Sequence, residues 1–472
     1  MNTTKRLPFL RPVAMAAATL VLTGCASFSR DGGLDSVSAL TTQRTGQAVQ
    51  FSKSEADTSV ADQKVSQLLS APLSAETAVQ VALLNNRGLQ ASLAELGVAE
   101  ADLVQAGRMA NPSFSFGRLA GGHDVEIERS VMFDIVGLLT IPLRSGIESR
   151  RFEIAKLQAA SEAVRLASET RKAYFNAVAA RQTALYMEQV RTSAEASAEL
   201  AKRMAEVGNF SKLDQAREQA FYADATAQVA RSRHNATVAR EQLVRLMGVW
   251  GLQTGLALPD RLPDLPQSTT SENNIETLAM EQRLDVQVAK RDADMTARAL
   301  GLSKATGVIN VMHAGYVNSS KTGSPRENGY EIELELPIFD WGRSRVAKAQ
   351  AIYMQSVHRT ADAAIRARSE VREAYSAYRT SHDLAKHYRD EVVPLRKKIS
   401  DEMLLRYNGM LIGVFELLAD ARTQVNSVNS AIEAQRDFWI AETELQAAVN
   451  GAGGGASKAM GTQASGEAAP AH

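Results

Sequence analysis

The side chain with the clearest chemistry in this chain is the thiol of Cys25, the only cysteine among 472 residues. It closes the tetrapeptide Leu22-Thr23-Gly24-Cys25, which follows an apolar stretch that begins at Val13. Three basic residues precede that stretch, at Lys5, Arg6 and Arg11. A positively charged start, a short apolar segment and a small-residue cleavage site are typical of a secretory signal. The tetrapeptide resembles a bacterial lipobox, in which the thiol is acylated, so residues 1–24 are predicted to be a lipoprotein signal peptide.

The residue after the cysteine bears on where such a lipoprotein is sent. Ala26, rather than Asp, follows Cys25, and by the sorting rule known for such lipoproteins this resembles an outer-membrane destination. The alternative is an ordinary signal peptide with an incidental cysteine, which would leave a free thiol in an oxidising compartment. No later apolar run reaches about 18 residues, so no second membrane-spanning helix is expected.

The remaining reactive side chains give no pattern that favours catalysis or metal binding. The seven His residues lack metal-ligand spacing, and no Gly-rich phosphate loop is present. No nucleophile can be paired with a base. His313, on a predicted strand, is predicted to line a lumen or an interface rather than to bind a metal. The sequence therefore predicts a protein that is not an enzyme and that carries no cofactor and no metal.

The composition narrows the choice of class further. Lys plus Arg and Asp plus Glu number 53 each, so no net electrostatic field favours nucleic acid as a partner. Aromatic residues make up only 6% of a chain that is rich in Ala, Glu, Gln and Arg. This composition favours long helices that pack through small side chains over one large globular core.

The chain contains an internal duplication. The segment RKAYF from Arg171 recurs as REAYS from Arg372, and the EVGN segment around Gly208 recurs as RYNGM around Gly409. The separation within each pair is the same. One duplication at this distance indicates two similar halves around a pseudo-symmetry axis, rather than a solenoid of short repeats.

Each half is predicted to contain a helix, two strands, a very long helix and a last helix. The predicted regions are an N-terminal arm at 25–71, a first repeat at 72–260, a linker at 261–271, a second repeat at 272–450 and a disordered tail at 451–472. The arm is predicted to be poorly ordered and to carry the lipid at its start. The tail is rich in Gly, Ala and Ser, which is typical of disorder.

Periodicity and turn residues give the expected elements within each repeat. In the first repeat they are a helix at 73–109, strands from 113 and over 125–141, a long helix at 145–207 and a helix at 213–247. In the second repeat they are a helix at 275–306, strands near 308–317 and 330–339, a long helix at 344–407 and a helix at 415–449. At about 1.5 Å per residue the helix at 145–207 spans roughly 95 Å. The shorter helices on either side of it are predicted to lie end to end along it, as parts of a long hairpin.

The predicted strands alternate charged and aliphatic residues. The acidic members are Glu126 and Glu128 in the first half and Glu331, Glu333 and Glu335 in the second. Alternation places the acids on one face and the aliphatic side chains on the other. An outward apolar face and an inward polar face are typical of a membrane barrel with a wet lumen, but a soluble sheet that lies on a helix would alternate in the same way. If the strands form a barrel, four per chain are too few to close it.

Longer motifs carry a family resemblance over residues 72–450. They are the helix opening LSAETAVQVALLNNRGLQASLAELGVAEADLVQAGRMANPSFSFG, the motif LPIFDWGRSR at Leu336–Arg345, and the hairpin breaks at Gly208 and Gly409. Together these resemble the TolC family of outer-membrane efflux ducts. The lipobox resembles the lipoprotein branch of that family.

The resemblance implies a mostly α fold with a small β part. Duplicated long helical hairpins would form a periplasmic α-barrel, and four strands per chain would contribute to a trimeric, 12-stranded outer-membrane β-barrel. The implied function is the passive exit duct of a tripartite efflux system. The implied partners are two further copies of the chain, outer-membrane lipid, a periplasmic adaptor and an inner-membrane transporter that supplies the energy.

In that family the hairpin tips close the periplasmic end through acidic rings, and the adaptor docks over the turns. The resemblance assigns the gate to Asp214, Glu416 and Asp420, and adaptor contact to Val207, Gly208, Asn209, Gly409, Met410 and Leu411. Glu416 matches Asp214 if the chain carries one extra residue after Gly409. Simpler roles remain open, because the acids could be solvated helix positions and the glycines could serve the turns alone.

Two other classes of protein share some of these features. A periplasmic helical-hairpin adaptor would also be lipidated, but it should contain one hairpin flanked by lipoyl-like and barrel segments. A structural coiled-coil lipoprotein would explain the helices and leave the paired strands unexplained. Neither the cargo nor the partner pump follows from these residues, so drugs, metal ions and solvents all remain open as substrates.

Overall fold

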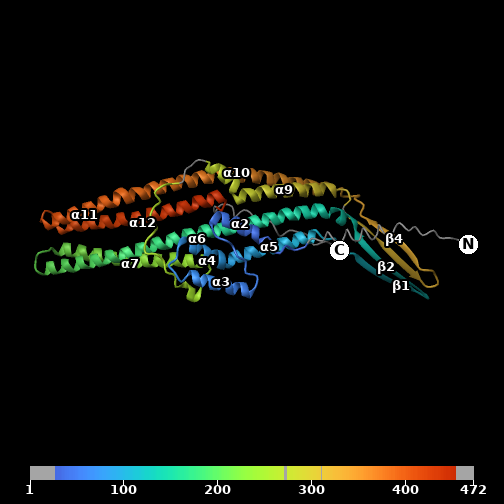
Figure 1. Cartoon of the computed structure of the whole chain (residues 1–472), viewed down its shortest axis with the longest axis horizontal. Helices are drawn as coiled ribbons and strands as arrows, with labels where there is room; N and C mark the ends of the chain where they lie inside the picture. Colours follow the sequence, from blue (N-terminus) through green and yellow to red (C-terminus); the bar gives the residue numbers. More distant parts are fainter. Residues whose placement is uncertain (1–26, 270–273, 310, 453–472) are drawn as a thin grey trace. The chain divides into compact units, whose positions relative to one another are not determined.

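The computed structural model describes residues 27–269, 274–309 and 311–452 (Figure 1). Cys25, the predicted signal peptide and nearly all of the predicted tail lie outside the described residues. The chain divides into two compact units, and each is assembled from segments that are far apart in the sequence. The two long helices α6 (Ile135–Glu206) and α10 (Arg343–His387) each contribute residues to both units.

The first unit holds the sheet, and it comprises the residues up to Asp35 together with 94–158 and 287–363. Its strands are β1 (Ser113–Gly121), β2 (Asp124–Asp134), β3 (Met312–Lys321) and β4 (Glu327–Leu334). They form one antiparallel sheet in the order β1-β2-β3-β4. The unit also contains most of α5 (Arg87–Ala106) and of α9 (Leu284–Ala305). Each repeat thus supplies one hairpin, and β2 joins β3 across the duplication.

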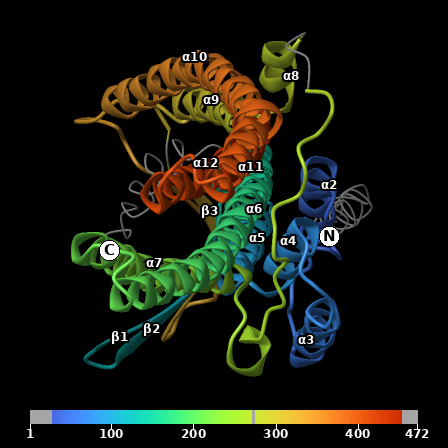
Figure 2. The same ribbon diagram turned by 90° about the vertical axis from the view of Figure 1, so that its left-hand side faces the viewer.

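The second unit comprises residues 36–93, 159–286 and the described residues from 364 onward. Its helices include α3 (Glu55–Leu68), α4 (Ala75–Asn85), α7 (Lys212–Met247), α8 (Ile275–Gln282), α11 (Val393–Asn408), α12 (Val414–Asn450) and the short 3₁₀ helix η1 (Gly251–Thr254). Within this unit α6 folds back into α7, and α11 folds back into α12 (Figure 2). The duplicated hairpins that the sequence predicts are therefore present.

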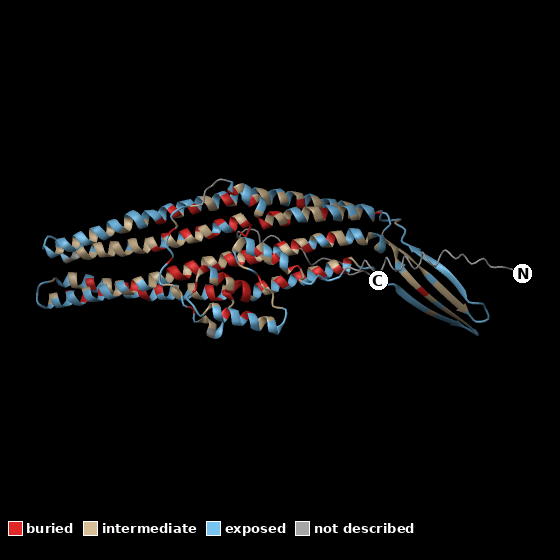
Figure 3. Cartoon of the chain, in the orientation of Figure 1, coloured by how far each residue is buried: buried red, intermediate tan, exposed pale blue. Residues whose placement is uncertain are grey.

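The core of the second unit is aromatic on the side of the second repeat. Tyr378 and Phe438 are buried and their ring centroids lie 5.7 Å apart. The carbonyl of Pro263, in the linker between the repeats, accepts hydrogen bonds from Gln435 and Trp439. Figure 3 shows buried residues along these helices, whereas the strands are almost entirely exposed or half-buried. The described residues include no helix that is both long and apolar enough to cross a membrane.

The first helix of each repeat is broken, although the sequence predicts unbroken helices at 73–109 and 275–306. The breaks fall at Asn86, where ψ is 116°, and at Arg283, where ψ is 121°. An extended residue interrupts the helical hydrogen-bond ladder and leaves backbone groups near the break without intrahelical partners. In both repeats the side chain at the break forms hydrogen bonds with carbonyl groups at the end of the last helix.

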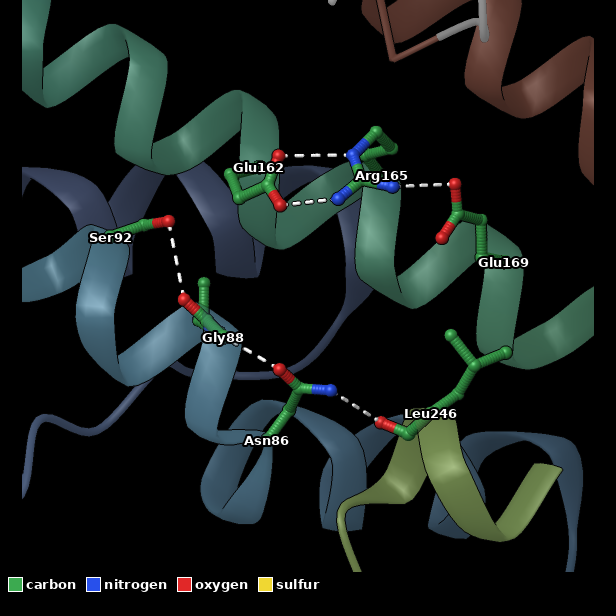
Figure 4. A network of polar contacts seen from close by, with 8 residues as sticks. Asn86, Gly88, Ser92, Glu162, Arg165, Glu169 and Leu246 are labelled. Atoms are coloured by element: carbon green, nitrogen blue, oxygen red, sulfur yellow. Dashed lines mark hydrogen bonds and ion pairs between the residues drawn. The ribbon is translucent and has the colours of Figure 1, made fainter. Parts of the chain in front are cut away.

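In the first repeat, Asn86 Nδ2 donates to the carbonyl of Leu246 at 2.9 Å, and its Oδ1 accepts from the Leu89 backbone N–H at 3.0 Å (Figure 4). Asn85 Nδ2 donates to the Gly248 carbonyl at 2.7 Å. Gly248 ends α7 in the left-handed region with φ 67°, and a Cβ there would lie 2.9 Å from the Asn85 carbonyl oxygen. These contacts form what we name the first kink closure.

In the second repeat, the charged side chain of Arg283 bonds the end of the last helix, as the Asn side chains do in the first repeat. Its guanidinium makes a two-point ion pair with Asp285, contacts Glu370 at 2.6 Å and donates to the Ala448 carbonyl at 3.0 Å. The residue is only 2% exposed. Gly451 ends α12 in the left-handed region, packed against the backbone of the break. These contacts form the second kink closure.

The start of α6 differs from the prediction. The sequence predicts strand over 125–141, but β2 ends at Asp134 and the helix begins at Ile135. Asp134 causes the switch, because its carboxylate accepts the Gly137 backbone N–H at 2.7 Å as a helix N-cap. The apolar run that follows has no strict alternation, and this is the feature that should have limited the predicted strand.

The long helix of the second repeat is also interrupted, where the sequence predicts one helix at 344–407. A π-helical turn, η2 (Tyr388–Val392), separates α10 from α11. Pro394 follows it at the start of α11. Proline has no N–H to donate and clashes with the preceding turn, so the helix widens locally. The long helix of the first repeat has no such break near its tip.

The N-terminal arm is ordered where it is described, contrary to the prediction of a poorly ordered segment over 25–71. It contains α2 (Leu34–Thr45) and α3, whose N-cap Ser54 forms a capping box with Asp57. Arg44 donates to the Gln282 carbonyl at 2.8 Å. Gln90 accepts the Ser52 backbone N–H at 3.0 Å. Polar composition misled the prediction, because a few apolar side chains of the arm, among them Val37 and Val65, are fully buried and the hydrogen bonds of Arg44 and Ser52 fix the arm in place.

Candidate functional site

The first hairpin tip is a tight turn between α6 and α7. Gly208 adopts φ 78°, and its N–H bonds the Ala205 carbonyl while the Asn209 N–H bonds the Met204 carbonyl. This pair of bonds is a Schellman motif, which favours glycine at the left-handed position. The side chain of Val207, just before the glycine, is exposed. The turn therefore presents small and apolar groups at the tip.

The second tip has the same geometry, displaced by one residue from the sequence alignment. The left-handed residue is Met410 with φ 57°, whereas Gly409 has φ −79°. The Met410 N–H bonds the Tyr407 carbonyl, and the Leu411 N–H bonds the Arg406 carbonyl. Met410 is therefore the structural counterpart of Gly208. A non-glycine residue in this region carries about 1–2 kcal/mol of strain.

The shifted register decides which acids correspond. Asp214 is the third residue of α7 and Glu416 is the third residue of α12. The two acids predicted to match therefore occupy equivalent positions at helix N-termini, where the helix dipole favours negative charge. The N-cap of α7 is Ser211, whose Oγ accepts the Asp214 backbone N–H at 3.1 Å. The Asp214 carboxylate accepts the Ser211 hydroxyl at 2.6 Å and pairs with Arg217 at 3.3 Å.

One turn further along, the same register brings Glu218 of α7 into correspondence with Asp420 of α12. Glu218 is 2% exposed and lies 4.0 Å from the Arg422 guanidinium. Arg422 also stacks 4.4 Å above the ring of Phe221. These contacts join α7 to α12, so the two hairpins meet at a buried charge close to their tips. We name Glu218, Phe221, Asp420 and Arg422 the interhairpin cluster.

Some buried polar atoms of the interhairpin cluster have no hydrogen-bond partner. Within the described part of the chain, Glu218 Oε2, Asp420 Oδ2 and Arg422 Nε are buried without a hydrogen-bond partner. Burial raises the pKa of Glu218, the Arg422 charge opposes that rise, and Asp214 adds to it. A buried carboxylate with one distant ionic partner is weakly compensated, so this contact is easily lost. Sequence reasoning missed Glu218 and Arg422, although Glu218 follows Asp214 by one helical turn on the same face.

The sheet places acids on one face, as the alternation predicts. Directly paired residues point to the same side of a sheet, and the register pairs Glu126 with Lys321, Glu128 with Ser319 and Ser319 with Glu327. The same rule puts Glu331, opposite Gly315, and Glu333, opposite His313, on this face. Glu335 lies just beyond β4, although its N–H still bonds the Val311 carbonyl. We call this side the polar face.

His313 lies on the polar face beside two carboxylates. Its Nδ1 is 3.4 Å from Glu333 Oε2, and Asp134 is its partner on β2. Asp134 is already occupied as the N-cap of α6. Across the described residues, no group of three His, Asp or Glu side chains is placed to hold a metal ion.

The opposite side, which we call the apolar face, carries large exposed side chains. Phe114, Val131, Tyr316 and Tyr330 form one row across the four strands. Tyr330 is 86% exposed, which is costly for an aromatic ring in water. A contiguous exposed apolar surface indicates contact with lipid or with another protein.

Solved structures with the same architecture were found, at low sequence identity. A membrane protein of Pseudomonas aeruginosa is 18% identical, with a TM-score of 0.70 over 79% of this chain and 93% of that one. The CmeC outer membrane channel of Campylobacter jejuni is 15% identical, with a TM-score of 0.69 over 80% of this chain and 86% of that one. The MtrE outer membrane channel of Neisseria gonorrhoeae, in its open state, is 15% identical, with a TM-score of 0.66 over 79% of this chain and 88% of that one. No protein-family model and no curated protein sequence matches the chain.

The chain has the TolC-like fold. The predicted fold class is therefore confirmed for the single chain, which has long duplicated helical hairpins and a four-stranded sheet. The TolC-like fold brings Asp214 and Glu416 to equivalent positions on their hairpins, and it groups Glu126, Glu128, Glu331 and Glu333 on one face of the sheet.

Proposed function

We propose that this chain is one protomer of an outer-membrane channel that serves as the passive exit duct of a tripartite efflux system. The proposal assigns the energy to an inner-membrane transporter and the connection to a periplasmic adaptor. It involves no catalysis by this chain. Three observations support it: the TolC-like fold, the two-sided sheet and the paired hairpin tips.

The two-sided sheet carries the proposal. Its apolar face exposes Phe114 and Tyr330, and its edges, β1 and β4, have no strand beside them within the described chain. A lipid environment leaves no unpaired backbone groups, so an open four-stranded sheet must be closed by other strands. Barrels need roughly eight strands or more. Three copies of this sheet supply twelve, which is the homotrimer that we propose.

In such a barrel the polar face lines the lumen. Glu126, Glu128, Glu331 and Glu333 then project into water, and Glu335 follows them at the mouth of the barrel. Repeated three times, these carboxylates bias the lumen towards cations. A coiled-coil lipoprotein would need neither the two hairpin strands of each repeat nor their shared polar face.

We further propose that the hairpin tips form the periplasmic gate and the adaptor contact. Symmetry would bring copies of Asp214 and Glu416 close to one another, where like charges repel and attract cations. Asp420 lies one turn deeper, in the interhairpin cluster. The exposed turn residues Val207, Gly208, Asn209, Gly409, Met410 and Leu411 would meet the adaptor.

The gate assignment is tested by removing charge without changing shape. Asp214→Asn combined with Glu416→Gln should raise single-channel conductance in planar bilayers, because the variant loses the cations that bind between the carboxylates and hold the constriction closed. Glu199→Gln is the matched control, since Glu199 is an exposed acid of α6 that pairs with Arg203. Equal conductance in the double variant and the control would contradict the gate.

The proposed lipid anchor is Cys25, which lies outside the described residues. Acylation there would tether the N-terminal arm to the same membrane that the barrel spans. The arm then returns to the second unit through the Arg44 and Gln90 hydrogen bonds.

The oligomer is the simplest test of the whole proposal. Outer membranes extracted with mild detergent should yield a trimer band on unheated gels that converts to monomer on heating. A protein released in soluble form as a monomer would contradict the channel.

A further inference from the structure

An exposed apolar stripe continues from the sheet into the first turns of α6. Leu138, Leu139, Pro142 and Leu143 are exposed, and their spacing places them on one side of the helix. Leu139 is 73% exposed. The helix follows β2 with no intervening loop (Figure 1). The stripe is thus a direct continuation of the strand that ends at Asp134.

The character of the exposed side chains changes at Arg144. The next exposed residues of α6 are polar, namely Ser149, Arg151 and Gln158. In the second repeat Arg343 follows the exposed Phe339 and Trp341. An apolar segment bounded by Arg, with aromatic residues nearby, is the pattern of a membrane–water interface.

The sheet itself is apolar over only part of its height. On the apolar face a polar row crosses three strands, in which Arg129 donates to Asn318 at 3.1 Å and Asn318 donates to Asn328 at 2.8 Å. These residues are direct partners in the register. A row of hydrogen-bonded polar groups belongs near the headgroups rather than in the hydrocarbon. The apolar part of the face therefore runs from this row down to the ends of the strands at Asp134 and Met312.

The apolar part of the strands is too short to cover the apolar band of a membrane barrel. From Arg129 to Asp134, or from Asn318 to Met312, strands tilted by about 40° rise only about 13–15 Å. The apolar band of a membrane barrel is about 25 Å tall. The shortfall is about 10 Å, and the nine residues of 135–143 supply roughly 14 Å of helix. The stripe on α6 has the length that the strands lack.

Lipid fits this stripe better than a second helix does. Where α6 packs within the chain, its apolar side chains are buried, both small ones such as Ala160 and Ala163 and larger ones such as Leu166. The Leu side chains of the stripe are exposed instead, and Pro142 interrupts the hydrogen-bond ladder of the helix there. Proline within a helix is more frequent in membranes than in water-soluble helices.

We propose that residues 135–143 form a helical collar embedded in the membrane, so that the bilayer boundary on the first repeat lies at Arg144 and not at the end of β2. This inference rests on the proposed barrel, because it extends that barrel's lipid-facing surface. The hydrocarbon zone is then shifted towards the helices, between the polar row of Arg129 and the Arg144 side chain. The partner of the collar is the acyl chain region of the phospholipid leaflet on the helical side.

Nitroxide labels can locate this boundary. Single variants Leu139→Cys and Leu143→Cys, with Ser149→Cys as the aqueous control, are labelled and reconstituted into phosphatidylethanolamine and phosphatidylglycerol vesicles. The parent chain, whose sole thiol is that of Cys25, gives the background. Collision with oxygen reports lipid, and collision with a water-soluble nickel chelate reports water. The collar predicts an oxygen-to-nickel accessibility ratio above one at 139 and 143 and below one at 149.

Tyr330→Cys separates failure of the collar from failure of the barrel, because Tyr330 lies on the apolar face below the polar row. Lipid contact at 330 with water contact at 139 and 143 would overturn the collar and leave the barrel intact. Labels at 139 and 143 that reach neither reagent would show a protein-covered face, and would overturn the collar equally. Water contact at all of these positions would contradict the barrel and the collar together.

Discussion

Removing the Arg283 guanidinium should release the end of α12 from the break between α8 and α9. Arg283→Met keeps the length and apolar stem of the side chain and deletes the charge of the second kink closure. It strands the carboxylates of Asp285 and Glu370 and the carbonyl of Ala448, which all accept from Arg283. The last turn of α12 then loses its side-chain partner.

The free-energy cost of Arg283→Met depends on how far the groups that lose their partner are exposed to water. Removing one partner of a buried ion pair costs about 3–5 kcal/mol, and a stranded buried carbonyl costs about 1–3 kcal/mol. The side chains of Asp285 and Glu370 are 19% and 37% exposed, so water recovers part of this cost. We expect a net loss of about 3 kcal/mol in the free energy of local opening. This corresponds to amide exchange that is faster by roughly 100-fold.

Hydrogen exchange followed by mass spectrometry measures this locally in the intact, detergent-solubilised protein. Peptides that cover the end of α12 and the start of α9 should exchange faster, whereas those that cover β1 and β2 should not change. Arg181→Met is the matched control, because Arg181 pairs with Asp260 at an exposed site where about 1 kcal/mol or less is at stake. Unchanged exchange in α12 of Arg283→Met, or equally fast exchange there in the control, would refute the role of Arg283 in the second kink closure.

Three further outcomes are expected. Burial raises the pKa of Glu218, so the folded tip holds its proton more tightly than the unfolded chain does. The contribution of Glu218 to stability is therefore fully present at pH values below the usual pKa of a carboxyl group. It is lost as the pH rises through the raised pKa of the folded state. Glu218→Gln should slow amide exchange at the tips roughly twofold to tenfold at about pH 8 and have little effect at about pH 4; faster exchange at pH 8 would contradict this. Met410→Gly should stabilise the second tip by about 1 kcal/mol, and Gly208→Ala should destabilise the first by a similar amount, both seen in local exchange; matching signs would refute the shared turn geometry. Cys25→Ser should abolish incorporation of labelled palmitate, and retained label would place the lipid elsewhere.

The helices and strands were predictable because the hydrophobic periodicity and the turn residues indicate the same elements along most of the chain. Helices α7 and α12 begin and end within one residue of the predicted bounds. Predictions failed where single side chains override the pattern. Asp134 caps a helix inside a predicted strand, and Pro394 widens a predicted helix into a π turn. Asn86 and Arg283 break helices whose apolar spacing continues through the break.

At the candidate site the sequence predicted residue types better than contacts. The sequence predicted that Asp214 matches Glu416 if the second tip carries one extra residue. The structure shows that residue, because Met410 and not Gly409 adopts the left-handed conformation of Gly208. The interhairpin cluster could not be predicted in full, because the pairing of Glu218 with Arg422 depends on how two hairpins pack in space. The duplication offered one indication, since Glu218 and Asp420 are repeat equivalents in this register.

The most direct test of the channel is electrical. Purified, full-length protein should be reconstituted into planar lipid bilayers and its current recorded under a small applied voltage. We expect discrete conductance steps that favour cations, because the acidic polar face lines the pore. An electrically silent protein that remains trimeric and inserted in the bilayer, with its gate acids replaced as above, would contradict it.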